Sequence, residues 1–152
     1  MARGPRTESL QVIIQDIRDK VMGRLQADNE PRLEGLQAVF YGEQQRIGVM
    51  RSPSLWVVAE PYNPEPTGGA TAIHRVPYNI VALVKDSQPE RGIKQAEWLA
   101  HGAYDVLMDG STLDDAVNIV LPGQVDPGFE AGSNQQLQFA AVQLVFEFRR
   151  KE

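Results

Sequence analysis

Residues Gln135–Phe148 read Gln-Gln-Leu-Gln-Phe-Ala-Ala-Val-Gln-Leu-Val-Phe-Glu-Phe. This stretch is rich in β-branched and aromatic residues and contains no Gly or Pro, which predicts a β-strand. At roughly 3.4 Å per residue it could reach about 45 Å, well beyond the usual strand of about 5–6 residues. A strand of this length either spans a whole sheet or extends past the domain into a neighbour. Its apolar residues alternate between two sides, with Leu137, Phe139, Ala141 and Val145 on one and Ala140, Val142, Leu144, Phe146 and Phe148 on the other.

The composition fits one globular domain with one core, because 42% of the 152 residues are hydrophobic and 23% are charged. The net charge of −5 argues against a nucleic-acid-binding protein, which usually presents a basic surface. The absence of cysteine excludes disulfides and zinc sites with Cys ligands. We find no signal-peptide pattern and no stretch of ~20 apolar residues that could cross a bilayer. We therefore expect a protein used in the cytoplasm, or built into a particle assembled there, without membrane contact.

Two segments have the apolar periodicity of amphipathic helices. The first begins near Thr7, after a flexible arm at residues 1–6, and its buried stripe ends at Leu25. The second begins at Ser87-Gln88-Pro89-Glu90, which matches a capping box with proline in the first turn, and runs to about Met108. Alanines at the centre of this second helix indicate close packing on a sheet.

Alternating apolar residues predict further strands at 54–60, 73–85 and 117–121, and shorter ones at 36–40 and 47–49. Residues 61–72 and 122–134 are rich in Pro and Gly, which predicts two long irregular loops. Residues 1–152 are thus predicted to form a single α+β domain. It would have a mostly antiparallel sheet of four to six strands, with two amphipathic helices packed on one face.

The polar residues form no recognisable catalytic motif. His74 and His101 could bind a metal together with an aspartate one helical turn after His101, but ordinary surface or half-buried histidines explain them better. The acidic residues between Asp105 and Asp115 lack the spacing of a calcium loop, and residues 67–71 lack the Lys-Ser/Thr of a phosphate-binding loop. We therefore expect no catalytic residues, no metal and no cofactor, and a protein that is not an enzyme.

Strands that are apolar on both sides need a cover on each face, and only two helices are available. The missing cover is expected to come from other copies of the same chain.

The order of elements extends this expectation. The first helix at Leu10–Leu25, the strand Pro77–Val84, the helix around Ala96–Ala100 and the closing strand Val142–Arg149 follow one another in a familiar order. In this order the chain resembles the tail terminator, or tail completion, proteins of long-tailed bacteriophages, the family of the lambda-type minor tail protein. The resemblance covers nearly the whole chain and lies in pattern rather than in an invariant signature.

This resemblance implies a structural virion protein that forms a ring, typically hexameric, on the end of the tail tube. The ring would end tube polymerisation and provide the head–tail joining surface. The implied partners are other copies of the chain, the tail tube protein and the head–tail connector or stopper protein. DNA would pass through the lumen without specific binding. The implied location is the tail or neck of the virion, assembled in the host cytoplasm.

The candidate functional residues are therefore contact residues. The candidate subunit interface is one side of the long final strand, either Val142, Leu144, Phe146 and Phe148 or the alternate set. The candidate docking residues lie on the two predicted loops, and they are Tyr62, Asn63, Glu65, Thr67, Gln124, Asp126, Phe129 and Glu130. Two alternatives stay open. One is another neck or head-completion protein, and the other is a small-molecule-binding α/β domain with residues 61–72 as its lid.

Overall fold

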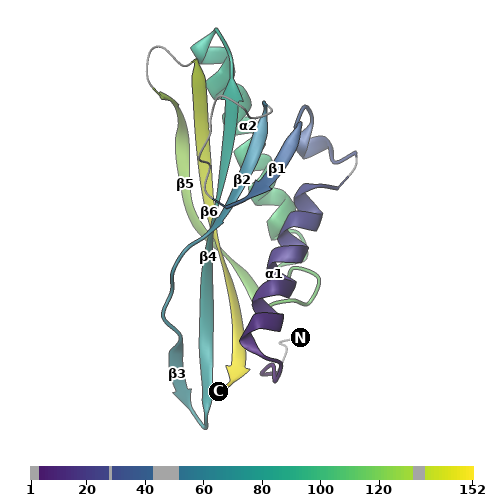
Figure 1. The fold of residues 1–152 in the computed structure, drawn as a ribbon, viewed down its shortest axis with the longest axis vertical. Helices are drawn as coiled ribbons and strands as arrows, with labels where there is room; N and C mark the ends of the chain where they lie inside the picture. Colours follow the sequence, from purple (N-terminus) through teal and green to yellow (C-terminus); the bar gives the residue numbers. More distant parts are fainter. Residues whose placement is uncertain (1–3, 28, 43–51, 132–135) are drawn as a thin grey trace.

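The computed structural model describes residues 4–27, 29–42, 52–131 and 136–152. Its elements are, in chain order, α1 Leu10–Leu25, the 3-10 helix η1 Pro31–Leu33, β1 Ala38–Tyr41, β2 Ser54–Ala59, β3 Glu65–Gly68, β4 Thr71–Lys85, α2 Pro89–Met108, β5 Ile119–Ala131 and β6 Leu137–Lys151 (Figure 1). The predicted α+β architecture is confirmed. The short strand predicted at 47–49 lies outside the described residues.

The strands form one sheet in the order β1-β2-β4-β6-β5, and β3 pairs with the first residues of β4. β1 and β2 are parallel, whereas the other pairs are antiparallel. β4 and β6 are the long central strands, paired from Thr71 opposite Lys151 to Lys85 opposite Leu137. The predicted long final strand is therefore confirmed, and it runs the full length of the sheet.

Both helices lie on the same side of the sheet, as predicted (Figure 1). On this side the central strands are apolar, with Tyr78 opposite Leu144 and Ile80 opposite Val142. All four side chains are at most 1% exposed. They join the buried stripes of α1 and α2 in one continuous core.

Helix α1 forms where the sequence predicts, three residues after the expected start. Ser9 is its N-cap, and the Ser9 hydroxyl accepts a hydrogen bond from the backbone N–H of Val12 at 3.3 Å. Its buried stripe packs into the core and consists of Ile13, Ile17, Val21 and Leu25. The stripe has the spacing that places apolar residues on one helix face.

Helix α2 also forms as predicted, but the capping box is wrong. The N-cap residue is Gln88, and its backbone N–H donates to the carboxylate of Asp86 at 2.8 Å rather than to Ser87. The same carboxylate pairs with Arg91 in the first turn, and the hydrogen bond from Arg91 lowers the pKa of Asp86. The helix start therefore has no side-chain cap, and the Asp86 carboxylate instead binds the backbone of the N-cap residue and the Arg91 side chain.

Residues 61–72 and 122–131 are not long irregular loops, so this part of the prediction is wrong, and residues 132–134 lie outside the described residues. Glu65–Gly68 is β3, residues 71–72 begin β4, and most of the second segment is β5. Prolines occur in these strands because β3 and β5 lie on sheet edges, where a missing N–H costs no ladder hydrogen bond. In β5 the register shifts between Pro122 and Val125, and again between Asp126 and Phe129. The two Pro-Gly pairs of β5 lie at these register shifts, which are β-bulges.

The prediction of a flexible arm at residues 1–6 is wrong for the last of these residues, Arg6. The backbone N–H of Arg6 donates to the carbonyl of Arg149 at 2.9 Å, and the N–H of Lys151 donates back to Arg6 at 3.0 Å. Arg6 is only 7% exposed, and its guanidinium reaches the carbonyl of Ala116 at 2.8 Å. Arg6 therefore adds to the end of β6, while residues 1–3 lie outside the described ranges.

Candidate functional site

The first candidate interface set faces the core. Val142, Leu144, Phe146 and Phe148 are at most 1% exposed and pack beneath the helices. A neighbouring chain could reach them only by opening the core, so this choice of strand side is corrected. Of the alternate set, Phe139, Ala141 and Val145 are half-buried and remain available for a subunit contact, whereas Leu137 is only 2% exposed.

The alternate set belongs to the sheet side that faces away from the helices, which we call the outer face. No helix or strand of the described residues covers this side. Its apolar members are mostly half-buried, and they are Phe40, Trp56, Val58, Val81, Leu121, Phe129, Phe139, Ala141 and Val145. Leu83 and Leu137 also lie on this face but are buried, at most 2% exposed. The apolar residues of the outer face are therefore neighbours in one patch rather than isolated side chains.

Two aromatic pairs flank the outer face. Phe40 and Trp56 stack near the β1 edge, with ring centroids 4.4 Å apart. Phe129 and Phe139 stack near the β5 edge, with ring centroids 5.5 Å apart. Between them lie the smaller side chains of Val81 and Ala141, which are register partners. The aromatic rings are held in place before any partner arrives, which lowers the entropy cost of binding.

The other end of the outer face is polar. Arg75 donates to Glu147 at 2.8 Å and to Glu65 of β3 at 2.5 Å, so it links three neighbouring strands. These hydrogen bonds raise the pKa of Arg75. Nearby, Asn79 donates to Glu60 at 2.5 Å. The outer face therefore changes from apolar to charged along the length of the sheet.

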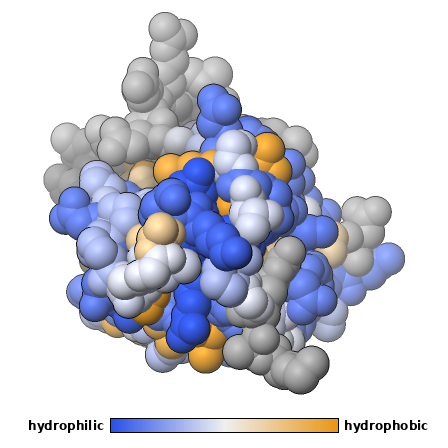
Figure 2. Space-filling model, turned by 90° about the horizontal axis from the view of Figure 1, so that it is seen from below, coloured by the Kyte–Doolittle hydropathy of each residue, from blue (hydrophilic) through white to orange (hydrophobic). Residues whose placement is uncertain are grey.

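The first predicted docking segment forms a hairpin that extends the sheet at this polar end (Figure 1). Asn63 and all of β3 are exposed, including Glu65, which is paired with Arg75. The Thr67 hydroxyl lies 2.8 Å from that of Thr71 and closes the turn. Viewed from this end, the surface is mostly hydrophilic, with apolar residues in small separate patches (Figure 2).

Tyr62 is placed differently, because it is half-buried and belongs to a polar cluster that the sequence did not predict. Its hydroxyl lies 2.9 Å from Nδ1 of His74, and Nε2 of His74 lies 2.7 Å from the Glu152 carboxylate. His74 is 1% exposed and stacks on Phe148. Burial raises the pKa of Tyr62, and the hydrogen bond with His74 lowers the pKa of Glu152. The partners occupy opposite ring nitrogens, so they cannot converge on one metal ion.

The second predicted docking segment lies on β5, near the opposite end of the sheet from β3. Phe129 is 53% exposed and belongs to the outer face. Gln124 donates to Asp126 at 2.6 Å, and Glu130 accepts from the buried Gln138 at 3.3 Å. The two docking segments are therefore separate surfaces rather than parts of one site.

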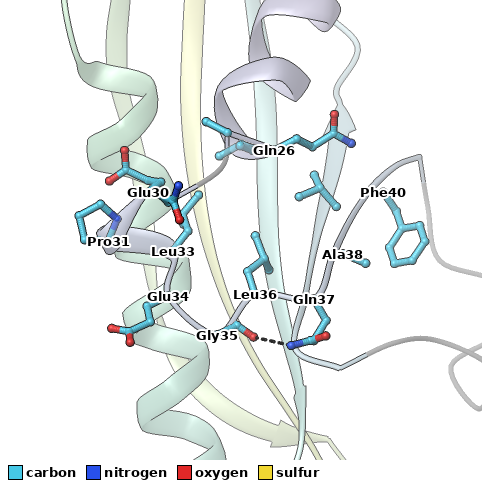
Figure 3. Close-up of a pocket in the computed structure, with 14 residues that line it drawn as sticks. Gln26, Glu30, Pro31, Leu33, Glu34, Gly35, Leu36, Gln37, Ala38 and Phe40 are labelled. Atoms are coloured by element: carbon cyan, nitrogen blue, oxygen red, sulfur yellow. Dashed lines mark hydrogen bonds between the residues drawn. The ribbon is translucent and has the colours of Figure 1, made fainter.

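A depression of about 880 Å³ lies on the helix side, between the end of α1, η1 and β1. Figure 3 shows Glu30 and Glu34 on the η1 side, Leu36 in the middle and Phe40 on the β1 side. Glu30 is already engaged with Arg32 at 2.7 Å, and the hydrogen bond from Arg32 lowers its pKa. The lining mixes polar and apolar residues, its ionisable members are Glu30 and Glu34, and the Arg32 that binds Glu30 is not part of it.

Within the described residues, no group of three His, Asp or Glu side chains could hold a metal ion. His101 is exposed on α2, whereas His74 is buried. In the same part of the chain no helix is long and apolar enough to span a membrane. Comparisons with protein-family models and with curated proteins find no match. The geometry of the outer face is therefore the main guide to function.

Proposed function

We propose that this chain is a structural virion protein that forms a ring on the end of a bacteriophage tail tube. The ring ends tube polymerisation and offers the surface that joins the tail to the head. Its partners are other copies of the chain, the tail tube protein and the head–tail connector or stopper protein. DNA passes through the ring without specific binding, and no catalytic step is involved.

One observation supports this proposal above all others. The outer face is an apolar sheet surface that lies opposite the helix layer and lacks a covering layer among the described residues. Two-layer domains bury their apolar faces, so a surface of this kind is typical of a subunit that is completed by assembly. The exposed hairpin at β3 and β4 is a second projecting surface, suited to docking on a tube or connector.

The proposal is tested by placing a charge at the centre of the outer face. Ala141→Arg is expected to leave the helix content and the cooperative unfolding of the single chain unchanged, because its side chain points away from the core. The variant should fail to form rings, as seen by light scattering and electron microscopy, and should fail to cap tail tubes. Gln26→Arg is the matched control, since Gln26 is exposed on the helix side. Equal assembly of both variants would contradict the proposal.

The depression beside η1 favours one other function, the binding of a small molecule. Its volume is within the range of ligand pockets, which is about 300–1,000 Å³. A screen of metabolites by thermal shift tests this. A ligand whose stabilisation is lost in Leu36→Glu but kept in Ala141→Arg would support ligand binding in place of ring formation.

A further inference from the structure

Large apolar side chains are exposed on two opposite sides of the molecule. On the outside of the helix layer, Trp98 is 57% exposed on α2 and Val12 is 53% exposed on α1. On the sheet side, Phe129 is 53% exposed and flanks the outer face. α2 turns its alanine stripe to the sheet, so Trp98 points away from it. One molecule therefore carries two different apolar surfaces that its own fold cannot bring together.

We propose that the outer face of one copy is covered by the outer surface of α2 of a second copy, with Trp98 packed near Val81 and Ala141. This contact would be the one between neighbouring subunits of the ring, so the inference rests on the proposed function. Val81 and Ala141 are neighbours in the β4–β6 register, and both are half-buried. Their side chains are smaller than the rings of the two aromatic pairs, and Asp126 of β5 is the other register partner of Ala141, so an indole ring packed here would meet apolar side chains with a carboxylate at the side.

The size of the outer face suits such a contact. Strands lie about 4.8 Å apart and rise about 3.4 Å per residue, so each residue occupies roughly 16 Å² of a sheet face. The outer face is built from the long strands β4, β5 and β6, of 13 to 15 residues, and the short strands β1 and β2, of four and six residues. The resulting area is on the order of 900 Å², close to the ~800 Å² that each partner contributes to a stable interface. The outer face is therefore large enough to hold a second copy by itself.

Strand addition at β5 or β3 is a weaker route to assembly, and the remaining edge, β1, is only four residues long and offers a short ladder to a new strand. β5 carries Pro122 and Pro127 and two register shifts, and β3 carries Pro66. A proline offers no N–H to a new strand, and bulges break the regular edge. Side chains on the faces, rather than backbone groups at these two edges, are thus available to neighbours.

Pairing of two outer faces with each other is also disfavoured. Such a contact is isologous, so it would close as a dimer and leave Trp98 and Val12 exposed in both copies. A contact between the helix layer of one copy and the outer face of the next is heterologous. It buries the helix surface of one copy and the outer face of the next. Each copy still has one unused surface for a further copy, so repetition of the contact forms a ring when the rotation between neighbouring copies closes.

Cysteine cross-linking tests this arrangement directly, because the chain has no cysteine of its own. We would place His101→Cys, one helical turn from Trp98, and Ala141→Cys in the same chain and add a short bismaleimide. The expected result is a ladder of covalent oligomers that neither single variant gives. A dimer formed by Ala141→Cys alone would overturn the inference, because it would show two outer faces in contact.

A second experiment separates this inference from the proposed function. Trp98→Lys should fold normally but sediment as a monomer, whereas Val125→Lys, which changes a 51% exposed residue on the β5 edge, should still assemble. The opposite result would overturn the inference and point to the edge. Assembly of both variants would overturn the inference and leave ring formation standing. A wild-type chain that stays monomeric even with tail tubes would overturn both.

Discussion

Gly102 sits where α2 meets η1, and its lack of a side chain lets the two elements touch. A Cβ at this position would lie 2.1 Å from the backbone carbonyl oxygen of Arg32. Because the obstacle is backbone, it cannot move aside as a flexible side chain can. The ion pairs of Arg32 with Glu30 and Asp109 then fix η1 against the end of α2.

Gly102→Ala is therefore expected to destabilise the protein by about 1–3 kcal/mol, the usual cost of overpacking. Gly23→Ala is the matched control, because it lies in α1 and a Cβ there meets nothing within 4 Å. The control should be neutral or stabilising by roughly 0.5–1 kcal/mol through helix propensity. Urea unfolding measures both, and equal effects would show that the α2–η1 contact is looser than described.

Two arginine–carboxylate contacts predict a loss of stability in acid. Hydrogen bonds from Arg32 lower the pKa of Asp109, and those from Arg24 lower the pKa of Asp114. The pKa of such a carboxyl group is lower in the folded protein than in the unfolded chain, where it is about 3.9. The group therefore stabilises the fold above the unfolded-state pKa, and this stabilisation is lost as the pH falls through the folded-state pKa. Both groups are exposed, so salt should weaken the effect.

The free energy of unfolding should thus fall below about pH 4, and it should fall less steeply in Arg24→Gln. Arg18→Gln is the control, since its guanidinium contacts Gln15 and the ring of Tyr41 instead. Unfolding by urea from pH 7 to pH 3 provides the measurement. The same pH profile in all three proteins would mean that the contact of Arg24 with Asp114 does not persist in solution.

For strand β6, the alternation of apolar residues predicts the strand but not which of its two sides faces the helices. Its length and the positions of both helices in the chain were predictable, because each has a strong apolar period. Which side of β6 faces the helices was not, because Phe146 on one side and Phe139 on the other are both large and apolar. The choice depends on the register of β4 and β6, which brings together residues far apart in sequence.

The two sides of β6 should differ sharply in stability measurements. Phe146 is fully buried and meets Tyr78 edge to face at 5.1 Å, so Phe146→Ala should cost about 3–5 kcal/mol. Phe139 is half-buried and stacks on an exposed ring, so Phe139→Ala should cost about 1 kcal/mol. Thermal and urea unfolding compare them, and a larger loss for Phe139→Ala would reverse the assignment of the two faces.

The edge strands explain the failed loop predictions. Pro and Gly in residues 61–72 and 122–134 argue against a central strand, whose backbone needs hydrogen-bond partners on both sides. They do not argue against an edge strand. At an edge one side needs no partner, and bulges accommodate the remaining residues. The cluster of Tyr62, His74 and Glu152 was missed for a related reason, because its members are 12 and 78 positions apart and no local pattern joins them.

That cluster should hold the start of the β3 hairpin in place. Tyr62→Phe removes only the hydroxyl that meets His74, and the expected loss is about 1 kcal/mol, the usual net value of a hydrogen bond. Amide exchange should become faster in β3 and at the start of β4 but not in β5. Uniform exchange throughout the sheet would show that the cluster does not act on the hairpin.

At the scale of the whole molecule, the chain has one complete core and one apolar face left over. The helices cover one side of the sheet, and the two aromatic pairs and Val81 lie on the other. Net charge and the absence of a metal cluster among the described residues do not by themselves identify a function. The leftover face is the observation on which the proposed assembly depends, and the prolines and register shifts of β3 and β5 disfavour strand addition at those two edges.

The most direct test of this account is the mass of the assembled protein, measured by sedimentation velocity over a wide range of concentrations, with and without tail tubes. The account predicts a closed ring, with a mass near six times 16.9 kDa, that disappears in Ala141→Arg while the helix content is unchanged. A single species of 16.9 kDa under all these conditions would contradict it. So would a ring that forms equally well when the outer face carries the added charge.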